Sequence, residues 1–315
     1  MTCYHPLQAF KTPDGVVFDE LARHDVIRAI ELPCGQCIGC RMRKASDWAL
    51  RIMHEASMHQ STCFVTLTYG RDCLPADGSL EHRDFQLFMK RLRKHVSRAA
   101  VQRNFDDPTS CRSVCAESHT RVRFFMCGEY GPLNLRPHFH ACLFGVDFRS
   151  DRSLSGKSAA GAVFFDSPLL SRLWSHGRVS VQDLTPETAS YCARYIMKKV
   201  LGPDASCAYV NDDGVIRRRE YAAMSLKPGI GASWFSKFGR DVYPHDFVVG
   251  AAGRKCPPPK YYDKLVRRGD LVDVDSLEFE RELRARRALA DNTPERRQVR
   301  EVVHNARVST LKRGL

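Results

Sequence analysis

The sequence predicts an α+β protein with a central antiparallel sheet, and three observations predict it. Two short apolar and aromatic stretches, 122–130 and 136–145, are joined by a link rich in turn-forming residues, as in a β-hairpin. A third stretch, 62–69, is β-branched and aromatic, which favours a buried strand. Helical periodicity occurs at 41–59, 84–94 and 185–200. We therefore expect a sheet with helices packed on one face.

The totals favour a polyanionic partner. The chain has 315 residues, enough to bury a sizeable core as one large domain or as a core with additions. It carries 49 Lys and Arg against 36 Asp and Glu, a net charge of +13 with a pI of about 9.3. This balance favours nucleic acid, although a generally basic soluble protein has the same totals. We expect three parts: a cysteine-containing segment with a basic helix (1–60), a core (61–205), and a basic and aromatic extension with a charged helical tail (206–315).

Composition also bears on location. No run of eighteen apolar residues occurs, so no transmembrane helix and no membrane partner are expected. The N-terminus lacks a basic region followed by an apolar one, which argues against export. Thirteen cysteines, an odd number, are then typical of reduced thiols in a cytoplasm.

Three of these cysteines are close together in the N-terminal part. Cys34, Cys37 and Cys40 form a C-x2-C-x2-C cluster in a glycine-containing loop. Three thiolates at this spacing can share a zinc ion, but a structural site needs a fourth ligand. The sequence does not rank the candidates for it, which are Cys3, His5, Cys63 and His54. A tight cysteine-rich turn without metal is the alternative.

The helices before the hairpin have apolar and basic faces. The stretch 41–59 places its alanines and Trp48 on one face, and its basic side chains lie elsewhere, available for phosphates or for solvent. The stretch 84–94 turns Phe85, Phe88, Met89 and Leu92 toward the sheet. Its opposite flank is a candidate for DNA backbone contacts, through Lys90, Arg91, Arg93 and Lys94.

The remaining segments before residue 185 are connections. Residues 97–120 break the helical pattern and are expected to form an insertion or long loop. The Gly-Lys-Ser of 156–158 is not a phosphate-binding P-loop, because Arg152 stands where the upstream glycine belongs. A short helix at 169–174 and a strand at 177–184 should lead to the helix that follows.

The hairpin carries a candidate metal site. His138 and His140 alternate with Phe139, so both imidazoles project from one side of a strand, about 7 Å apart. Antiparallel pairing with 122–130 would bring Glu129 beside them. Two imidazoles and a carboxylate with open coordination positions are suited to a divalent ion. Two unrelated histidines on a strand are the alternative.

The helix at 185–200 carries a candidate nucleophile pair. Thr185 can cap it, Pro186 suits the first turn, and Glu187 favours the positive end of the helix dipole. Tyr191, Tyr195 and Lys199 fall at successive i, i+4 steps and form one stripe. Phosphodiester transfer to a protein hydroxyl would need such a stripe, although tyrosines at this spacing also occur in ordinary helix packing.

The C-terminal third mixes aromatic and basic residues. Residues 227–262 interleave Trp, Phe and Tyr with Lys and Arg, which suits stacking on single-stranded DNA. Packing of the same rings against the core is the alternative. The stretches 278–287 and 295–311 are charged and helical with little apolar face, typical of a peripheral or partner-binding tail.

In combination, these motifs resemble a known family. His138-x-His140 followed by Tyr191, Tyr195 and Lys199 resembles the two-tyrosine HUH endonucleases of rolling-circle replication. More narrowly, the chain is similar to the replication initiators of microviruses, especially gokushoviruses. The stretches that carry the narrower resemblance are 33–41, 64–69, 128–131, 136–140, 191–199, 227–231, 234–235, 241–244 and 257–263.

The resemblance implies a fold, a chemistry and partners. HUH nucleases have a ferredoxin-like or RRM-like sheet, here in the core 61–205, with the tyrosine helix across the metal-bearing strands. A Mg²⁺ or Mn²⁺ ion on His138, His140 and Glu129, with zinc as the alternative, would polarise the scissile phosphate. Tyr191 or Tyr195 would attack, and Lys199 or its neighbour Lys198 would stabilise negative charge.

The product implied is a 5′-phosphotyrosine with a free 3′-hydroxyl, which starts rolling-circle synthesis and allows later rejoining. The partners are single-stranded or supercoiled origin DNA and, because the chain has no helicase P-loop, a host helicase and polymerase in the bacterial cytoplasm. Two rivals stay open. One is a plasmid initiator, relaxase or transposase of the HUH type. The other is a non-catalytic, zinc-containing DNA-binding regulator.

Overall fold

The computed structural model describes residues 3–19, 25–106, 121–131, 134–158, 161–194, 209–210, 214–269 and 272–310. The chain divides into two compact units. The smaller consists of Met1–Ser46 with Val272–Arg313, and the larger of Asp47–Leu271 with Gly314–Leu315. The boundary therefore falls within helix α1 (Ile38–Ala56). The three-part division expected from composition stays a prediction.

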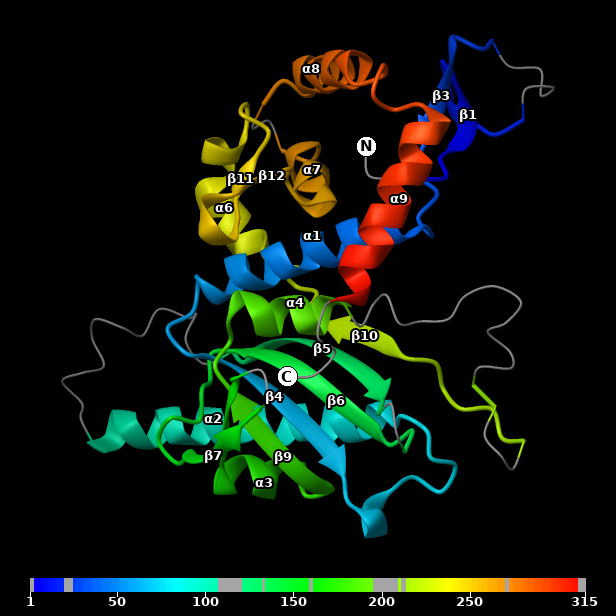
Figure 1. The fold of residues 1–315 in the computed structure, drawn as a ribbon. Helices are drawn as coiled ribbons and strands as arrows, with labels where there is room; N and C mark the ends of the chain where they lie inside the picture. Colours follow the sequence, from blue (N-terminus) through cyan, green and yellow to red (C-terminus); the bar gives the residue numbers. More distant parts are fainter. Residues whose placement is uncertain are drawn as a thin grey trace. The chain divides into compact units, whose positions relative to one another are not determined.

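The larger unit is built on an antiparallel sheet (Figure 1). Among its described residues the sheet has seven strands in the order β10-β5-β6-β4-β9-β8-β7. The strands are β4 (Thr62–Tyr69), β5 (Arg123–Tyr130), β6 (Pro137–Phe144), β7 (Ser153–Lys157), β8 (Val163–Asp166), β9 (Gly177–Gln182) and β10 (Tyr221–Met224). The predicted fold class, α+β with a central antiparallel sheet that carries the His-x-His pair, is confirmed.

One face of the sheet is covered by α2 (His82–Asp106) and α3 (Pro168–Trp174). The predicted apolar face of α2 is confirmed, because Phe85, Phe88, Met89 and Leu92 are all buried. Each such side chain contributes about 2 kcal/mol by leaving water. The α2 helix continues to Asp106, so the loop expected from residue 97 is wrong for 97–106, and residues 107–120 lie outside the described part.

Helices also pack on the opposite face, where none was expected. There the edge of the Tyr191 ring meets Phe64, with 6.2 Å between ring centroids, and Trp48 of α1 lies 5.0 Å from Phe125. Tyr191 belongs to α4 (Pro186–Arg194), which packs on β5 and β6. Phe64, Phe125 and Cys142 make this face apolar over part of its width, so it too must be covered. The expectation of helices on one face only is corrected.

The rest of the larger unit follows β10. It comprises α6 (Ala232–Val242), β11 (Val248–Val249), a 3-10 turn η4 (Ala251–Gly253), β12 (Lys255–Cys256) and α7 (Lys260–Val266), with another 3-10 turn, η1 (Arg71–Cys73), after β4. The His54 ring stacks on Trp234 at 3.6 Å and accepts or donates a 2.8 Å hydrogen bond with Tyr262. Phe235 stacks on Tyr262 at 5.1 Å. For these rings the structure favours packing over DNA stacking.

The smaller unit has a small sheet and two helices. Its strands β1 (Leu7–Thr12), β2 (Gly15–Val17) and β3 (Arg28–Leu32) pair in the order β2-β1-β3. Its helices are the N-terminal part of α1 together with α8 (Val274–Arg287) and α9 (Pro294–Ser309), close to the predicted charged helices. Polar pairs connect these helices to the sheet: Arg28 with Glu282, and Arg297 with Glu31 at 2.8 Å. Surface pairs of this kind are weak.

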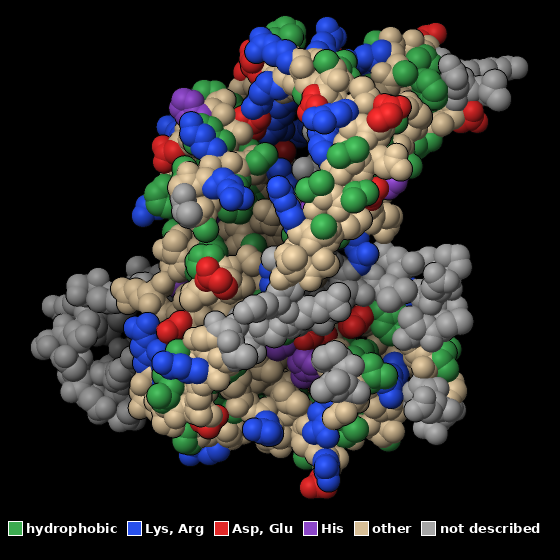
Figure 2. Space-filling model, in the orientation of Figure 1, with side chains coloured by type: hydrophobic (Ala, Val, Ile, Leu, Met, Phe, Trp, Pro, Cys, Tyr) green, Lys and Arg blue, Asp and Glu red, His purple; other side chains and the backbone are tan. Residues whose placement is uncertain are grey.

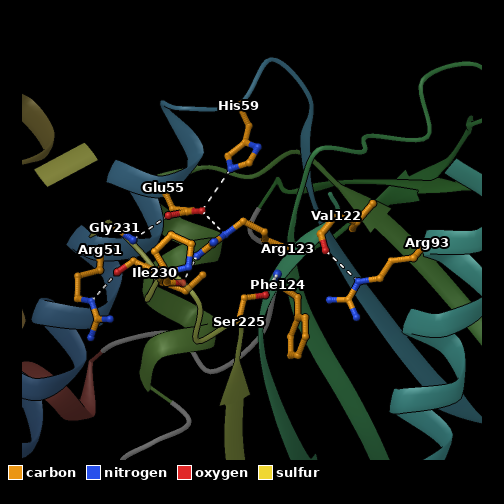
Figure 3. Close-up of polar contacts among 11 residues, drawn as sticks. Arg51, Glu55, His59, Arg93, Val122, Arg123, Phe124, Ser225, Ile230 and Gly231 are labelled. Carbon is orange, nitrogen blue, oxygen red and sulfur yellow. Dashed lines mark hydrogen bonds and ion pairs between the residues drawn. The ribbon is translucent and has the colours of Figure 1, made fainter. Parts of the chain in front are cut away.

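A buried ion pair ties α1 to β5 inside the larger unit (Figure 3). Arg123 Nε lies 2.6 Å from Glu55 Oε1, and the two side chains are 9% and 1% exposed. The backbone NH of Gly231 donates to Glu55 Oε2 at 2.8 Å, and Arg123 donates to Pro228 O at 2.7 Å. Burial raises the pKa of Glu55, but the hydrogen bonds to His59 and Gly231 and the charge of Arg123 outweigh it and lower the pKa. The carboxylate is therefore ionised inside the protein.

Replacing Arg123 by methionine should destabilise the larger unit by about 3–5 kcal/mol, because it leaves a buried carboxylate without its cation. The loss should be largest above the ordinary pKa of Glu55 and should shrink as acid protonates the carboxylate. Arg93→Met is the matched control, since Arg93 gives a single 3.1 Å bond to Val122 O. Urea unfolding measures both. Equal shifts in the two variants would show that the ion pair contributes nothing particular.

Candidate metal centre and tyrosine helix

Strand pairing brings the three predicted metal ligands together. β5 and β6 pair antiparallel, as predicted, with Glu129 opposite His138. Cys127 stands opposite His140 in the same pair, and Thr66 of β4 stands opposite His140 on the other side. Because directly opposed residues share a face of the sheet, the carboxylate and both imidazoles project to one side.

The donor atoms converge. Glu129 Oε1 lies 2.7 Å from His138 Nε2 and 2.8 Å from His140 Nε2. One donor atom from each residue lies within 4.8 Å of the others. The Glu129 and His140 side chains are 2% and 7% exposed, whereas His138 is 14% exposed and marks the side open to solvent. In the space-filling view, histidine and acidic side chains lie together over the central sheet of this unit (Figure 2).

The carboxylate of Glu129 stays ionised. Burial raises its pKa, but the hydrogen bonds and charges of His138 and His140 outweigh that effect and lower the pKa to about 2. A buried negative charge held this way is an obvious ligand for a cation. At any pH near neutrality no proton has to be removed from Glu129 before an ion can bind.

Neighbouring groups fix the orientation of both rings. His138 Nδ1 donates to the carbonyl oxygen of Arg136 at 3.0 Å, since a carbonyl can only accept. His140 Nδ1 pairs with Thr66 Oγ1 at 3.0 Å. Histidine ligands are commonly oriented in this way through the nitrogen that does not bind the metal, which leaves Nε2 for the ion. The sequence had singled out the strand containing Thr66 but not the role of its hydroxyl, which appears only with the register of β4 on β6.

The donor set fits a divalent ion. Two imidazole nitrogens and one carboxylate oxygen on one side leave the remaining positions to water and substrate. Mn²⁺ accepts this mixture readily, whereas Mg²⁺ prefers oxygen and keeps several waters. The three residues would hold the ion from β5 and β6, which are central strands and therefore rigid.

Replacing Glu129 by glutamine should weaken Mn²⁺ binding by about 100-fold or more, because even residues that only support a ligand are worth 10- to 100-fold. Glu81→Gln is the control, since the Glu81 side chain is 39% exposed and pairs with Arg218. Manganese titration followed by electron paramagnetic resonance gives both affinities. Unchanged affinity in Glu129→Gln would place the third ligand elsewhere.

The start of the tyrosine helix is formed as predicted. Thr188 N donates to Thr185 Oγ1 at 3.3 Å, and Thr185 N donates back to Thr188 Oγ1 at 2.8 Å. These reciprocal bonds satisfy amide groups that a helix start leaves unpaired. The helix α4 then begins at Pro186.

Tyr191 lies against the metal donors. Its ring meets His140 edge-on, with 5.1 Å between ring centroids and an interplanar angle of 89°. One residue further on, Cys192 Sγ lies 3.6 Å from Cys127 Sγ and 3.8 Å from the carbonyl oxygen of His140. Cys192 therefore fixes α4 directly on β5 and β6. Tyr195, Lys198 and Lys199 lie outside the described residues.

A polar strip continues from the histidines across the sheet. Thr68 stands opposite His138, and on β9 Arg178 and Ser180 stand opposite Thr68 and Thr66. All of these positions share the face of the metal donors. Thr66, Thr68 and Ser180 are half-buried and Arg178 is exposed, so a DNA strand could reach them. Only the alternation in 62–69 announced this strip in the sequence.

The cysteine cluster gains a fourth member. Sγ atoms of Cys3, Cys34, Cys37 and Cys40 lie within 4.8 Å of one another. The other candidates have different surroundings: His5 pairs with Glu301 at 2.8 Å, His54 pairs with Tyr262, and Cys63 is buried in β4. Among the described residues, Cys3 is the one that completes the set.

The described helices include none with the length and apolar character needed to cross a membrane. This agrees with the hydropathy of the sequence. The localisation expected from the resemblance, the cytoplasm of a bacterial host, stays a prediction.

Comparison with known proteins gives one consistent result. Residues 62–200 match the family model of the replication-associated protein ORF2. The chain is 30% identical to replication-associated protein VP4 of Bdellovibrio phage phiMH2K over 83% of its own length and 76% of the relative's. It is 27% identical to replication-associated protein ORF2 of Spiroplasma virus 4, covering 92% and 88% of the two chains. Replication-associated protein ORF4 of Chlamydia phage 1 is 28% identical over 84% of this chain and 60% of its own. No solved structure matches.

Proposed function

The chain belongs to the replication-associated proteins of the microviruses, and from that premise we propose that it initiates rolling-circle replication by nicking one DNA strand through a tyrosine. A role in phage DNA replication follows from the family. The finer statement, a metal-dependent endonuclease and strand transferase at the replication origin, is the proposal.

One observation carries it. The ring of Tyr191 lies 5.1 Å from the ring of His140, and the His140 Nε2 atom lies 2.8 Å from the buried carboxylate of Glu129. A candidate nucleophile and a candidate ion site therefore meet on one face of the sheet. Phosphodiester cleavage by a covalent route needs both within reach of one phosphate.

The chain's own residues would act as follows. A divalent ion bound by Glu129, His138 and His140 supplies Lewis-acid polarisation of a non-bridging phosphate oxygen. The phenol oxygen of Tyr191 or Tyr195 forms a bond to phosphorus while the bond from phosphorus to the 3′ oxygen breaks. The phenol loses its proton, and the leaving 3′ oxygen takes one up to become a hydroxyl. Lys199 or Lys198 would stabilise the negative charge that develops.

The product keeps the energy of the broken bond. A 5′-phosphotyrosine can be attacked by a 3′-hydroxyl in the reverse sense, so one protein can open a strand and later close the displaced circle. Two tyrosines one helical turn apart would let the two reactions alternate between Tyr191 and Tyr195. The free 3′-hydroxyl would prime a host polymerase, and a host helicase would separate the strands.

Incubating the full chain with end-labelled single-stranded DNA of its own phage genome and Mn²⁺ tests the proposal. We expect a labelled band that survives denaturation at the mass of protein plus DNA, and no such band with a chelator. The alternative from another class, a DNA-binding regulator, would shift the DNA on a native gel without cutting it. Binding without cleavage would therefore contradict the proposal.

A further inference from the structure

We propose that Cys3, Cys34, Cys37 and Cys40 bind one zinc ion that fastens the N-terminal segment to the start of α1. This site lies in the smaller unit and takes no part in the proposed cleavage reaction. Its role would be structural, because four thiolates fill the tetrahedral shell of zinc and leave no position for a substrate.

The sulfur geometry matches a zinc site rather than a disulfide. The Sγ atoms of Cys3 and Cys37 are 3.9 Å apart. Two thiolates on a zinc ion, each about 2.3 Å from the metal in tetrahedral geometry, are separated by about 3.8 Å. A disulfide would require about 2.05 Å. All four cysteines are free thiols, and their sulfurs lie within 4.8 Å of one another.

Backbone amides point at these sulfurs. Cys34 N donates to Cys3 Sγ at 3.3 Å, and Tyr4 N donates to Cys37 Sγ at 3.3 Å. The amides of Gln36 and Cys37 donate to Cys34 Sγ at 3.4 and 3.3 Å. A hydrogen bond to sulfur favours the thiolate over the thiol, and the thiolate is the form that binds metal.

Local structure pre-forms the loop. Gly35 has a φ of +76°, a conformation that residues with a side chain rarely adopt, and it turns the chain between Cys34 and Cys37. The helix α1 begins at Ile38, so Cys37 and Cys40 lie at its N-terminal end. The partial positive charge there offsets part of the excess negative charge that four thiolates bring to a divalent ion.

The smaller unit also needs such a link. In its described part, 3–19, 25–46 and 272–310, the buried apolar side chains are Cys3, Ala9, Ala45 and Leu277. Phe18, Ile27 and Phe279 are more than half exposed. Small units that cannot bury a sufficient core are commonly held by metals or disulfides. Zinc at this position would close a loop of about 30 residues between Cys3 and Cys34, including β1 to β3.

The two metal sites differ in chemistry and can be tested apart. Thiolates select zinc, whereas imidazole with carboxylate and water accepts manganese or magnesium. The full chain, purified without a histidine tag or added metal, should carry about one zinc per chain by elemental mass spectrometry. Cys3→Ser should reduce this nearly to zero, whereas His140→Ala and the exposed Cys73→Ser should leave it unchanged. A zinc-free wild type, or full zinc in Cys3→Ser, would overturn the inference.

A measurement on the wild type covers the case in which Cys3→Ser does not fold. Cys34, Cys37 and Cys40 are only half-buried, so burial alone does not protect them from alkylation. We expect them to react much more slowly than Cys73 until a strong chelator removes the zinc, and then at a comparable rate. Alkylation of all three at the rate of Cys73 before chelation would show that no ion holds them.

Discussion

Replacing both Tyr191 and Tyr195 by phenylalanine should abolish covalent protein–DNA adducts, with a loss of about 10⁴-fold or more. Phenylalanine keeps the ring that packs edge-on against His140 and Phe64 and removes only the oxygen. The fold and DNA binding should therefore survive. The assay is a denaturing gel with end-labelled single-stranded DNA and Mn²⁺. Tyr261→Phe is the control, because Tyr261 belongs to α7 and packs under Arg51.

The single variants refine this prediction. If nicking and rejoining alternate between the two phenols, at least one single variant should still form an adduct but fail to rejoin a circle. An adduct that persists in the double variant would rule out the tyrosine mechanism. It would also leave Tyr191 as a packing residue of α4, the alternative that its position already allows.

Replacing His140 by alanine should reduce metal-dependent nicking by about 10³-fold or more, because it removes a metal ligand next to the nucleophile. The same change leaves Glu129 with one imidazole partner fewer, at a cost of about 1–3 kcal/mol. Circular dichroism must therefore show that the variant is folded at the assay temperature. His245→Ala is the control, since His245 is exposed.

The outcome discriminates between roles for His140. Nicking that is restored by high Mn²⁺ would identify the loss as one of ion affinity. Cleavage undiminished at all Mn²⁺ concentrations would remove His140 from the site, because a residue in the metal shell cannot be deleted without effect.

The sequence was most informative where local rules act alone. Period-two alternation placed His138 and His140 on one side of a strand, and the turn-rich link predicted the pairing that brings Glu129 opposite His138. Thr185 announced the start of α4 by its capping chemistry. These features depend on a few neighbouring residues, so one sequence suffices.

Features that depend on contacts distant in the chain were not predictable. Cys3 reaches Cys34 only because β1 and β3 pair, and nothing in residues 1–33 indicated those strands. The polar strip through Thr68 and Arg178 required the register of β4 on β9. The loop expected from residue 97 proved helical up to Asp106, since alanine and valine after residue 98 continue α2 until the segment that contains Pro108.

Peptide mapping of the adduct formed by the wild-type chain tests the central claim most directly. The protein is incubated with single-stranded DNA and Mn²⁺, the DNA is digested, and mass spectrometry locates the residue that carries a nucleotide. The account predicts a nucleotide linked through its 5′-phosphate to Tyr191 or Tyr195. Cleaved DNA with no nucleotide on either tyrosine, or a nucleotide on a residue remote from His138 and His140, would contradict it.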